Sequence, residues 1–225
     1  MKRAWIVAGG AGIAIATVAI VRSRHARAQS RPDFNRSVLA RAESDLGVIE
    51  TSPNSGPRVD EMLRSVGINV PANWCAAAVS TWVREAAREL GVGVPIAGSA
   101  SVLSIVQEMR DPNNPKVGWI ETTDLRAHPE RVRPGMIVAW TRGLPGSGLG
   151  HIGIVESSDS RGAFVHIDGN AGANADRVAK GTSDLSSASL IGMGFFRDIA
   201  VGLGDYNFAL GYYNDPPGAL LFPLS

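Results

Sequence analysis

The sequence of 225 residues predicts an α+β fold, with helices in its first half packed on an antiparallel β-sheet formed by its second half. Two observations predict this class. Apolar residues from Cys75 to Leu90 recur every three or four positions, as they do on one face of a helix. Residues 150–156 and 163–168 are rich in β-forming residues and are separated by a short polar break, which is typical of a hairpin.

The other elements follow from the same periodicities and from turn residues. Helices are expected at residues 37–46, 59–66, 75–90 and 100–109, and strands at 136–140, 150–156, 163–168, 176–180 and 190–197. Residues 116–133 are polar and irregular, and the glycine-rich stretch 141–150 is expected to be a loop that leads to His151.

Four regions are predicted along the chain: an N-terminal segment (1–30), a linker (31–36), one catalytic domain (37–198) and a tail (199–225). Residues 37–198 are numerous enough to bury a hydrophobic core. The tail contains no Lys or Arg. Packing on the domain and docking of a protein partner both remain open for it.

Charge is nearly balanced overall, with 22 Lys and Arg against 21 Asp and Glu. It is uneven locally, because residues 1–41 hold eight basic residues and one acidic residue, which leaves 14 basic and 20 acidic residues beyond them. The domain is therefore mildly acidic, which argues against a nucleic-acid partner.

Residues 4–21 form an uncharged run of 18 residues that approaches the length needed to cross a bilayer. Half of these residues are Ala or Gly, and arginines follow the run closely. A retained membrane anchor and a cleaved signal sequence, with a cleavage site around Ala28, are both consistent with this pattern. Either one predicts an envelope or exported protein.

Cys75 is the only cysteine of the chain, which excludes an intramolecular disulfide. The helical periodicity places it in a first turn, with Asn73 as the expected N-cap residue. Free backbone N–H groups and the positive end of the helix dipole favour a thiolate at such a position. The alternative is a small buried core residue, since free cysteines commonly pack in that way.

The predicted hairpin supplies partners for a nucleophile. A turn centred on Asp159 and Ser160 would pair Gly153 with His166 and His151 with Asp168. Opposed side chains lie close enough for a carboxylate to reach an imidazole. Asn170 continues the face of Asp168 and offers a second orienting group, and His166 on that face is an alternative base.

The ordered motifs Trp74–Ala77, Arg133–Trp140, Gly150–Val155 and Asp168–Asn170 resemble those of the CHAP peptidases, which are cysteine, histidine-dependent amidohydrolases related to NlpC-type cell-wall hydrolases. The resemblance runs from about residue 37 to residue 197. Met136 departs from it, because the family commonly has Asp after Pro-Gly.

This resemblance implies a papain-like fold and cleavage of amide bonds in peptidoglycan. It makes Cys75 the nucleophile, His151 the base, Asp168 the acidic third residue and Asn170 the amide that follows. Trp74 and Trp140, within the matching motifs, are candidate substrate-binding residues. No cofactor is expected, and residues 69–72 before the cysteine contain no carboxylate for the calcium loop that some relatives carry.

The sequence thus predicts a peptidoglycan amidase or endopeptidase, of cellular origin or from a bacteriophage as a lysin or virion-associated lytic protein. The competing hypothesis is a non-catalytic envelope or virion protein that binds cell wall through a similar fold. A protease of ordinary proteins is a third hypothesis.

Overall fold

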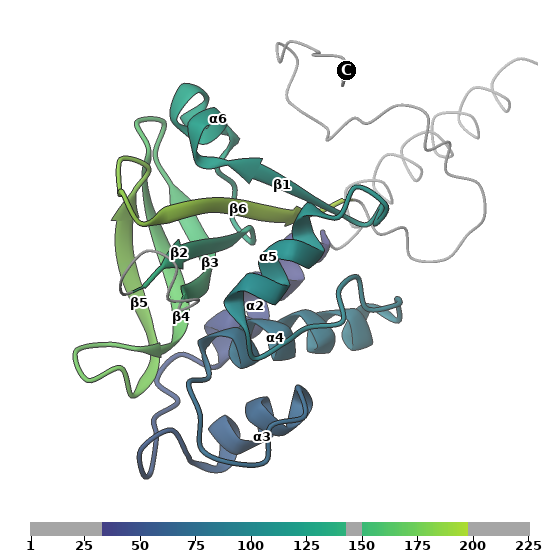
Figure 1. Ribbon diagram of the computed structural model, residues 1–225, viewed down its shortest axis with the longest axis vertical. Helices are drawn as coiled ribbons and strands as arrows, with labels where there is room; N and C mark the ends of the chain where they lie inside the picture. The colour runs from purple at the N-terminus through teal and green to yellow at the C-terminus, as the bar shows by residue number, and fades with distance from the viewer. Residues whose placement is uncertain (1–32, 143–149, 198–225) are drawn as a thin grey trace, which may run out of the picture. The chain divides into compact units, whose positions relative to one another are not determined.

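The computed structural model divides the chain into two units, residues 1–32 and 33–225, and describes residues 33–142 and 150–197 of the second. The described part is an α+β fold whose sheet has six strands in the order β1-β6-β2-β3-β4-β5, every neighbouring pair antiparallel (Figure 1). The predicted α+β class and antiparallel sheet are confirmed. The predicted N-terminal segment, the tail and residues 143–149 of the predicted loop lie outside the described residues.

The helices are α2 (Phe34–Ser44), α3 (Pro57–Ser65), α4 (Cys75–Leu90), α5 (Val102–Arg110), α6 (Thr122–Ala127) and the 3-10 helix η1 (Pro129–Arg131). Helix α2 begins three residues before the predicted start, because the Asp33 side chain accepts a hydrogen bond from the backbone N–H of Asn35 and caps the helix there. Residues 34–36 of the predicted linker are therefore helical.

The strands are β1 (Val117–Glu121), β2 (Ile137–Thr141), β3 (Gly150–Ser158), β4 (Ala163–Ala171), β5 (Arg177–Asp184) and β6 (Leu190–Phe196). The prediction that residues 116–133 are irregular is wrong, since β1, α6 and η1 lie there. These elements are too short to show a period clearly in the sequence. Leu125 and Val132 nevertheless bury their side chains in this region.

Helix α4 contacts α2 and α3 as well as β3 and β4. Every residue from Cys75 to Val83 is buried, so the expectation of a single inward face does not hold for its first half. The residues between the large apolar ones are Ala, Ser and Thr, whose small side chains allow neighbouring elements to approach from several sides. The helix ends as predicted at Gly91, which adopts a left-handed conformation with φ of 65°.

A buried carboxylate joins helices α2, α3 and α4. Asp45, which follows α2, accepts a hydrogen bond of 2.8 Å from the Trp82 indole of α4 and another of 2.8 Å from Arg58 of α3. Glu85 of α4 also pairs with Arg58. The helix that carries Cys75 is thereby fixed to α2 and α3 by polar contacts as well as by packing.

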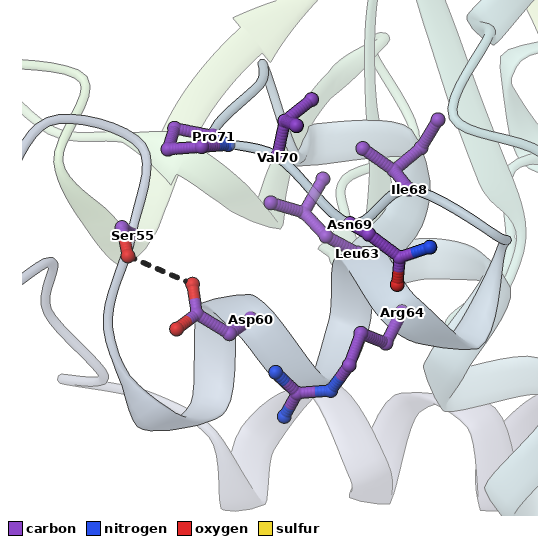
Figure 2. A pocket seen from close by; sticks show the side chains of 8 residues that line it. All are labelled: Ser55, Asp60, Leu63, Arg64, Ile68, Asn69, Val70 and Pro71. Atoms are coloured by element: carbon purple, nitrogen blue, oxygen red, sulfur yellow. Dashed lines mark hydrogen bonds between the residues drawn. The ribbon is translucent and has the colours of Figure 1, made fainter.

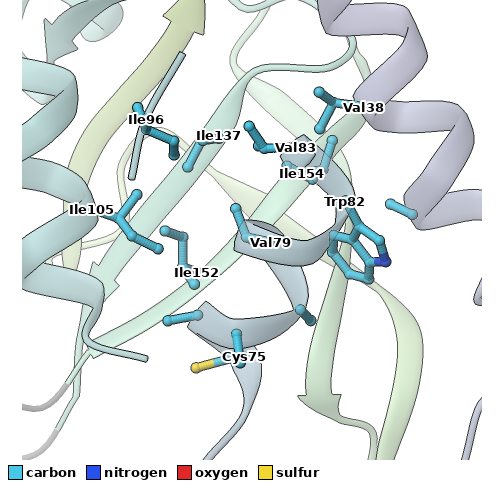
Figure 3. Close-up of a cluster of buried hydrophobic side chains, with 14 of the residues drawn as sticks. Val38, Cys75, Val79, Trp82, Val83, Ile96, Ile105, Ile137, Ile152 and Ile154 are labelled. Atoms are coloured by element: carbon cyan, nitrogen blue, oxygen red, sulfur yellow. The ribbon is translucent and has the colours of Figure 1, made fainter. Parts of the chain in front are cut away.

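Two hydrophobic clusters cover the sheet. The first lies between the sheet and helices α2 to α5, and Figure 3 shows Cys75 at its edge, one helical turn from Val79. The second cluster, on the opposite face, includes Val138, Trp140 and Met193 of the sheet and Leu125 of α6. The sheet is therefore buried on both faces.

No helix within residues 33–142 and 150–197 is long and apolar enough to cross a membrane. The predicted segment 4–21 lies outside these ranges.

Candidate active site

Cys75 is the first residue of α4, as its predicted place in a first turn requires. The N-cap position belongs to Trp74, and no side chain caps the helix there, so the prediction of Asn73 as N-cap is wrong. The first backbone hydrogen bond of the helix runs from the Ala78 N–H to the Trp74 carbonyl, at 2.8 Å. The backbone N–H groups of Cys75 and the next two residues therefore have no intrahelical acceptor.

Trp74 anchors the first turn of α4 through buried contacts. Its side chain has no exposed surface, and its indole Nε1 donates to Glu50 Oε1 at 2.7 Å. Gly169 of β4 lies against it, and a Cβ there would come 2.7 Å from both the Trp74 ring and the Ala78 methyl. The placement of Trp74 argues against the predicted substrate contact and gives the residue a positioning role.

The register of the hairpin differs from the predicted one. Val155 rather than Gly153 pairs with His166, and a bulge at Glu156 separates this pairing from that of Ser157 with Val165. Continuing the observed register places Gly153 opposite Asp168, so the predicted direct pairing of His151 with Asp168 is wrong. Because the difference is two residues, each side chain stays on its predicted face of the sheet.

His151 and Asp168 nevertheless meet diagonally. His151 Nε2 lies 2.9 Å from Asp168 Oδ2, and both side chains are buried. The carboxylate reaches across Gly153, where an added Cβ would lie 1.8 Å from Oδ1 of Asp168. The absence of a side chain at position 153 is therefore what permits this contact.

The hydrogen bonds define the tautomer of His151. An ionised carboxylate only accepts, so Nε2 carries a proton, and in the neutral imidazole Nδ1 is then the basic nitrogen. Nδ1 is buried and has no hydrogen-bond partner among the described residues. The imidazole also interacts with the Cys75 thiol, and Asp168 occupies Nε2, which leaves Nδ1 for the sulfur.

Burial alone would lower the pKa of His151. The hydrogen bond with Asp168, the interaction with the nearby Cys75 thiol and the charges of these two groups outweigh burial and raise that pKa from 6.5 to about 9. The imidazole is therefore held in its protonated form at neutral pH, beside the only cysteine of the chain.

Asp168 has a second imidazole partner, which the sequence suggested only as an alternative base. His166 Nδ1 lies 2.7 Å from Asp168 Oδ1. Burial favours the neutral acid, but the hydrogen bonds from His151 and His166 dominate and lower the pKa of Asp168. The signal for this contact in the sequence was the two-residue spacing of His166 and Asp168 on one strand face.

Asn170 continues the same strand but serves another residue. It adopts a left-handed conformation with φ of 54°, at the irregular pairing between β4 and β5 that follows Asp168. Its Nδ2 donates to Asn73 Oδ1 at 3.3 Å. The amide thus ties the strand to the segment just before Cys75, and its hydrogen bond goes to Asn73 instead of to the imidazole of His151.

Trp140 lies beside both histidines. Its ring centroid is 5.9 Å from that of His151 and 4.8 Å from that of His166, and only 7% of the residue is exposed. This small exposure leaves a narrow surface for the predicted substrate contact. Its larger role in the structure is to pack the two imidazoles.

The pocket drawn in Figure 2 lies beside α3, and none of the predicted catalytic residues lines it. Its volume is about 210 Å³, and its lining residues are Ser55, Asp60, Leu63, Arg64, Ile68, Asn69, Val70 and Pro71. Asp60 accepts hydrogen bonds from Ser55 and from the backbone of Gly56. Its carboxylate therefore serves the start of α3, away from the predicted catalytic residues.

No protein-family model matches the chain, and no curated protein is significantly similar to it. Among residues 33–142 and 150–197, no group of three or more His, Cys, Asp or Glu side chains is arranged to hold a metal ion.

Proposed function

We propose that this protein is a cysteine-dependent amide hydrolase of the papain-like, CHAP type that cleaves peptidoglycan. The observation that carries the proposal is the imidazole of His151, which interacts with the Cys75 thiol and holds Asp168 on its other nitrogen at 2.9 Å. Nucleophile, base and orienting group are the three parts that covalent catalysis by a thiol requires. The antiparallel sheet and the helix that begins at the nucleophile support the same class.

In this mechanism the Cys75 thiolate attacks the carbonyl carbon of the amide and forms a covalent acyl-enzyme. The imidazolium of His151 gives its proton to the leaving amine, and the neutral imidazole then activates the water that releases the acid. Asp168 stabilises the imidazolium in both halves of the cycle. The free backbone N–H groups of the first turn, including that of Cys75, would bind the oxyanion.

The substrate class rests on the motifs and on the N-terminal segment. An uncharged run at residues 4–21 would bring the domain to the cell envelope, either as an anchor or as a cleaved signal. Amide bonds of peptidoglycan stem peptides or cross-bridges are the substrate class found there. Both a cellular hydrolase and a bacteriophage lysin or virion-associated protein fit this proposal.

The test is digestion of purified peptidoglycan by residues 31–225 and by the Cys75→Ala variant. We expect release of new amino and carboxyl groups by the first protein and none by the second. Alanine is well accommodated in a helical first turn, so the variant should keep its circular dichroism spectrum. Mass spectrometry of the released fragments identifies the bond.

Three outcomes would contradict parts of the proposal. Equal digestion by the Cys75→Ala variant would exclude the thiol mechanism. Binding to peptidoglycan without any digestion would favour the non-catalytic wall-binding protein. Cleavage of casein with no effect on peptidoglycan would favour a protease of ordinary proteins.

A further inference from the structure

We propose that His166 is a positioning residue of this site, which holds the Asp168 carboxylate against His151 by donating a hydrogen bond to its second oxygen. The inference deepens the proposed function and rests on the Cys75 and His151 pair as the reacting groups. It assigns a role to a histidine that would not itself touch the substrate.

The contacts around Asp168 carry this inference. Its two carboxylate oxygens are divided between two imidazoles, with Oδ2 at 2.9 Å from His151 and Oδ1 at 2.7 Å from His166. Asp168 is 3% exposed. A carboxylate buried to this degree needs partners for both oxygens, because an unpaired buried charge is costly. His166 supplies the partner that His151 cannot.

Asp168 sets the tautomer of His166, and Ser183 lies at the other nitrogen of the ring. The Ser183 hydroxyl lies 3.3 Å from His166 Nε2. Because the carboxylate of Asp168 only accepts, Nδ1 of His166 must donate, and in the neutral ring Nε2 is then left to accept from the hydroxyl. The Ser183 hydroxyl thus donates to His166, and His166 and His151 both donate to Asp168, so that the hydrogen bonds converge on the carboxylate. His151 in turn interacts with Cys75.

Two glycines leave space for the side chains of Asp168 and His166. A Cβ at Gly153 would lie 1.8 Å from Asp168 Oδ1, and a Cβ at Gly181 would lie 2.5 Å from His166 Cε1. Trp140 packs against the His166 ring at a centroid distance of 4.8 Å. The ring therefore has little freedom to rotate, which is what a group that orients another must provide.

The titratable groups near Asp168 are few. His151 faces it from β3, His166 shares its strand, and Cys75 of α4 lies beyond His151. From β5 the facing residues are Ala179, Gly181 and Ser183, and β2 contributes Trp140, none of which is charged. Lys180, which pairs with Glu156, alternates with Gly181 and points to the other face of the sheet. A pH-dependent effect of substitution at His166 would therefore be transmitted through Asp168.

The test compares two variants of the full chain. His166→Phe keeps a ring beside Trp140 but removes the donor. His166→Asn removes the ring but keeps an N–H donor at nearly the position of Nδ1. We expect kcat for peptidoglycan to fall roughly tenfold or more in His166→Phe, with KM unchanged, and to remain near wild type in His166→Asn.

A second readout needs no substrate. Because the chain has one cysteine, alkylation by iodoacetamide reports on Cys75 alone. Without the His166 donor, the Asp168 carboxylate should protonate more readily or turn away from His151. It then stabilises the His151 imidazolium less, and the imidazolium in turn stabilises the Cys75 thiolate less. Rapid alkylation should therefore begin at a higher pH in His166→Phe than in wild type, and at the wild-type pH in His166→Asn.

Ser183→Ala provides a milder variant should His166→Phe fail to fold. Loss of the hydroxyl removes the hydrogen bond at Nε2 that helps to hold the His166 ring, and the alkylation profile should shift in the same direction by a smaller amount. An unshifted profile in folded His166→Phe, or equal effects of Phe and Asn, would overturn the inference. An alkylation profile that shifts as expected in a protein that does not digest peptidoglycan would retain the inference and reject the proposed substrate.

Discussion

Gly153 and Asp168 lie in adjacent strands so close together that a single added methyl group at residue 153 would overlap the carboxylate. A Cβ at this position would lie 1.8 Å from Asp168 Oδ1, far inside van der Waals contact. Asp168 can cross to His151 only over a residue without a side chain. The contact that carries the proposed mechanism therefore depends on a glycine as much as on the charged groups.

The first prediction follows from this contact. Gly153→Ala should push the carboxylate away from His151 and lower kcat by roughly a hundredfold, because misplacement of an orienting group by about 1 Å has effects of that size. Hydrolysis of peptidoglycan and circular dichroism of the same samples provide the measurement.

Gly93→Ala is the matched control. Gly93 has no positive φ, and only the Lys116 amine would lie near the added Cβ, at 3.4 Å. We expect wild-type activity from this variant. Full activity of a folded Gly153→Ala protein would show that the contact between Asp168 and His151 is not needed.

The periodic patterns predicted the helix at Cys75, the hairpin and the face that His151 and Asp168 share. They could not give the register, because a bulge at Glu156 and the hairpin turn decide it. The two-residue difference changed the partners of each residue but not its face. This is why the imidazole and the carboxylate lie within hydrogen-bond reach of each other, although the predicted pairing was wrong.

Other features had no clear signal in the sequence. Residues 117–131 contain one short strand and two short helices, whose lengths are below those at which periodicity is informative. Trp74 is the N-cap residue of α4. The Asn73 side chain, expected to cap the helix, instead accepts a hydrogen bond from the Asn170 amide. Such long-range side-chain partners depend on the tertiary fold, and local preference alone does not reveal them.

The second prediction separates the roles of the two polar residues at the end of β4. Asp168→Ala should lower kcat more than Asn170→Ala does, since a carboxylate stabilises the imidazolium, whereas the Asn170 amide reaches Asn73. The measurement is kcat for peptidoglycan with each purified variant.

The left-handed conformation of Asn170, with φ of 54°, complicates its substitution by alanine. Asn170→Gly removes the amide without that backbone strain and is the control. If both Asn170 variants lose more activity than Asp168→Ala, Asn170 is the principal third residue.

The third prediction concerns pH. The pKa of His151 is raised to about 9, because the hydrogen bond with Asp168 and the interaction with Cys75 outweigh the effect of burial. The imidazolium that protonates the leaving amine should therefore be lost as pH rises through about 9, and kcat should fall there. An NMR titration of the His151 ring should give the same midpoint, and the midpoint should be lower in Cys75→Ala.

The same shift has a consequence for stability. The pKa of His151 is higher in the folded chain than in the unfolded one, so its contribution to the free energy of unfolding is fully present below about pH 6.5 and is lost as pH rises through about 9. The loss should be at most on the order of 3 kcal/mol. Urea unfolding at several pH values measures it, with His151→Asn as the control that lacks this dependence. A His151 that titrates near 6.5 would contradict both statements.

The last prediction concerns where the protein acts, and it follows from the uncharged run at residues 4–21 and the arginines that flank it. If the run is a retained anchor, the full chain should sediment with membranes. If it is a cleaved signal, the protein should begin near Gln29 and should be soluble. Cleavage there removes five basic residues and no acidic one, so the net charge changes from +1 to −4. We expect the anchor, because arginines directly after an apolar run resist translocation and a run of this length favours retention.

N-terminal sequencing of protein from the membrane and soluble fractions distinguishes the two forms. A uniform start near Gln29 would exclude the anchor. Intact protein that moves from the membrane to the periplasm when the membrane is depolarised would identify a third form, an anchor that can leave the bilayer. The nine Ala and Gly residues make the run only weakly hydrophobic, which is the property such a release requires.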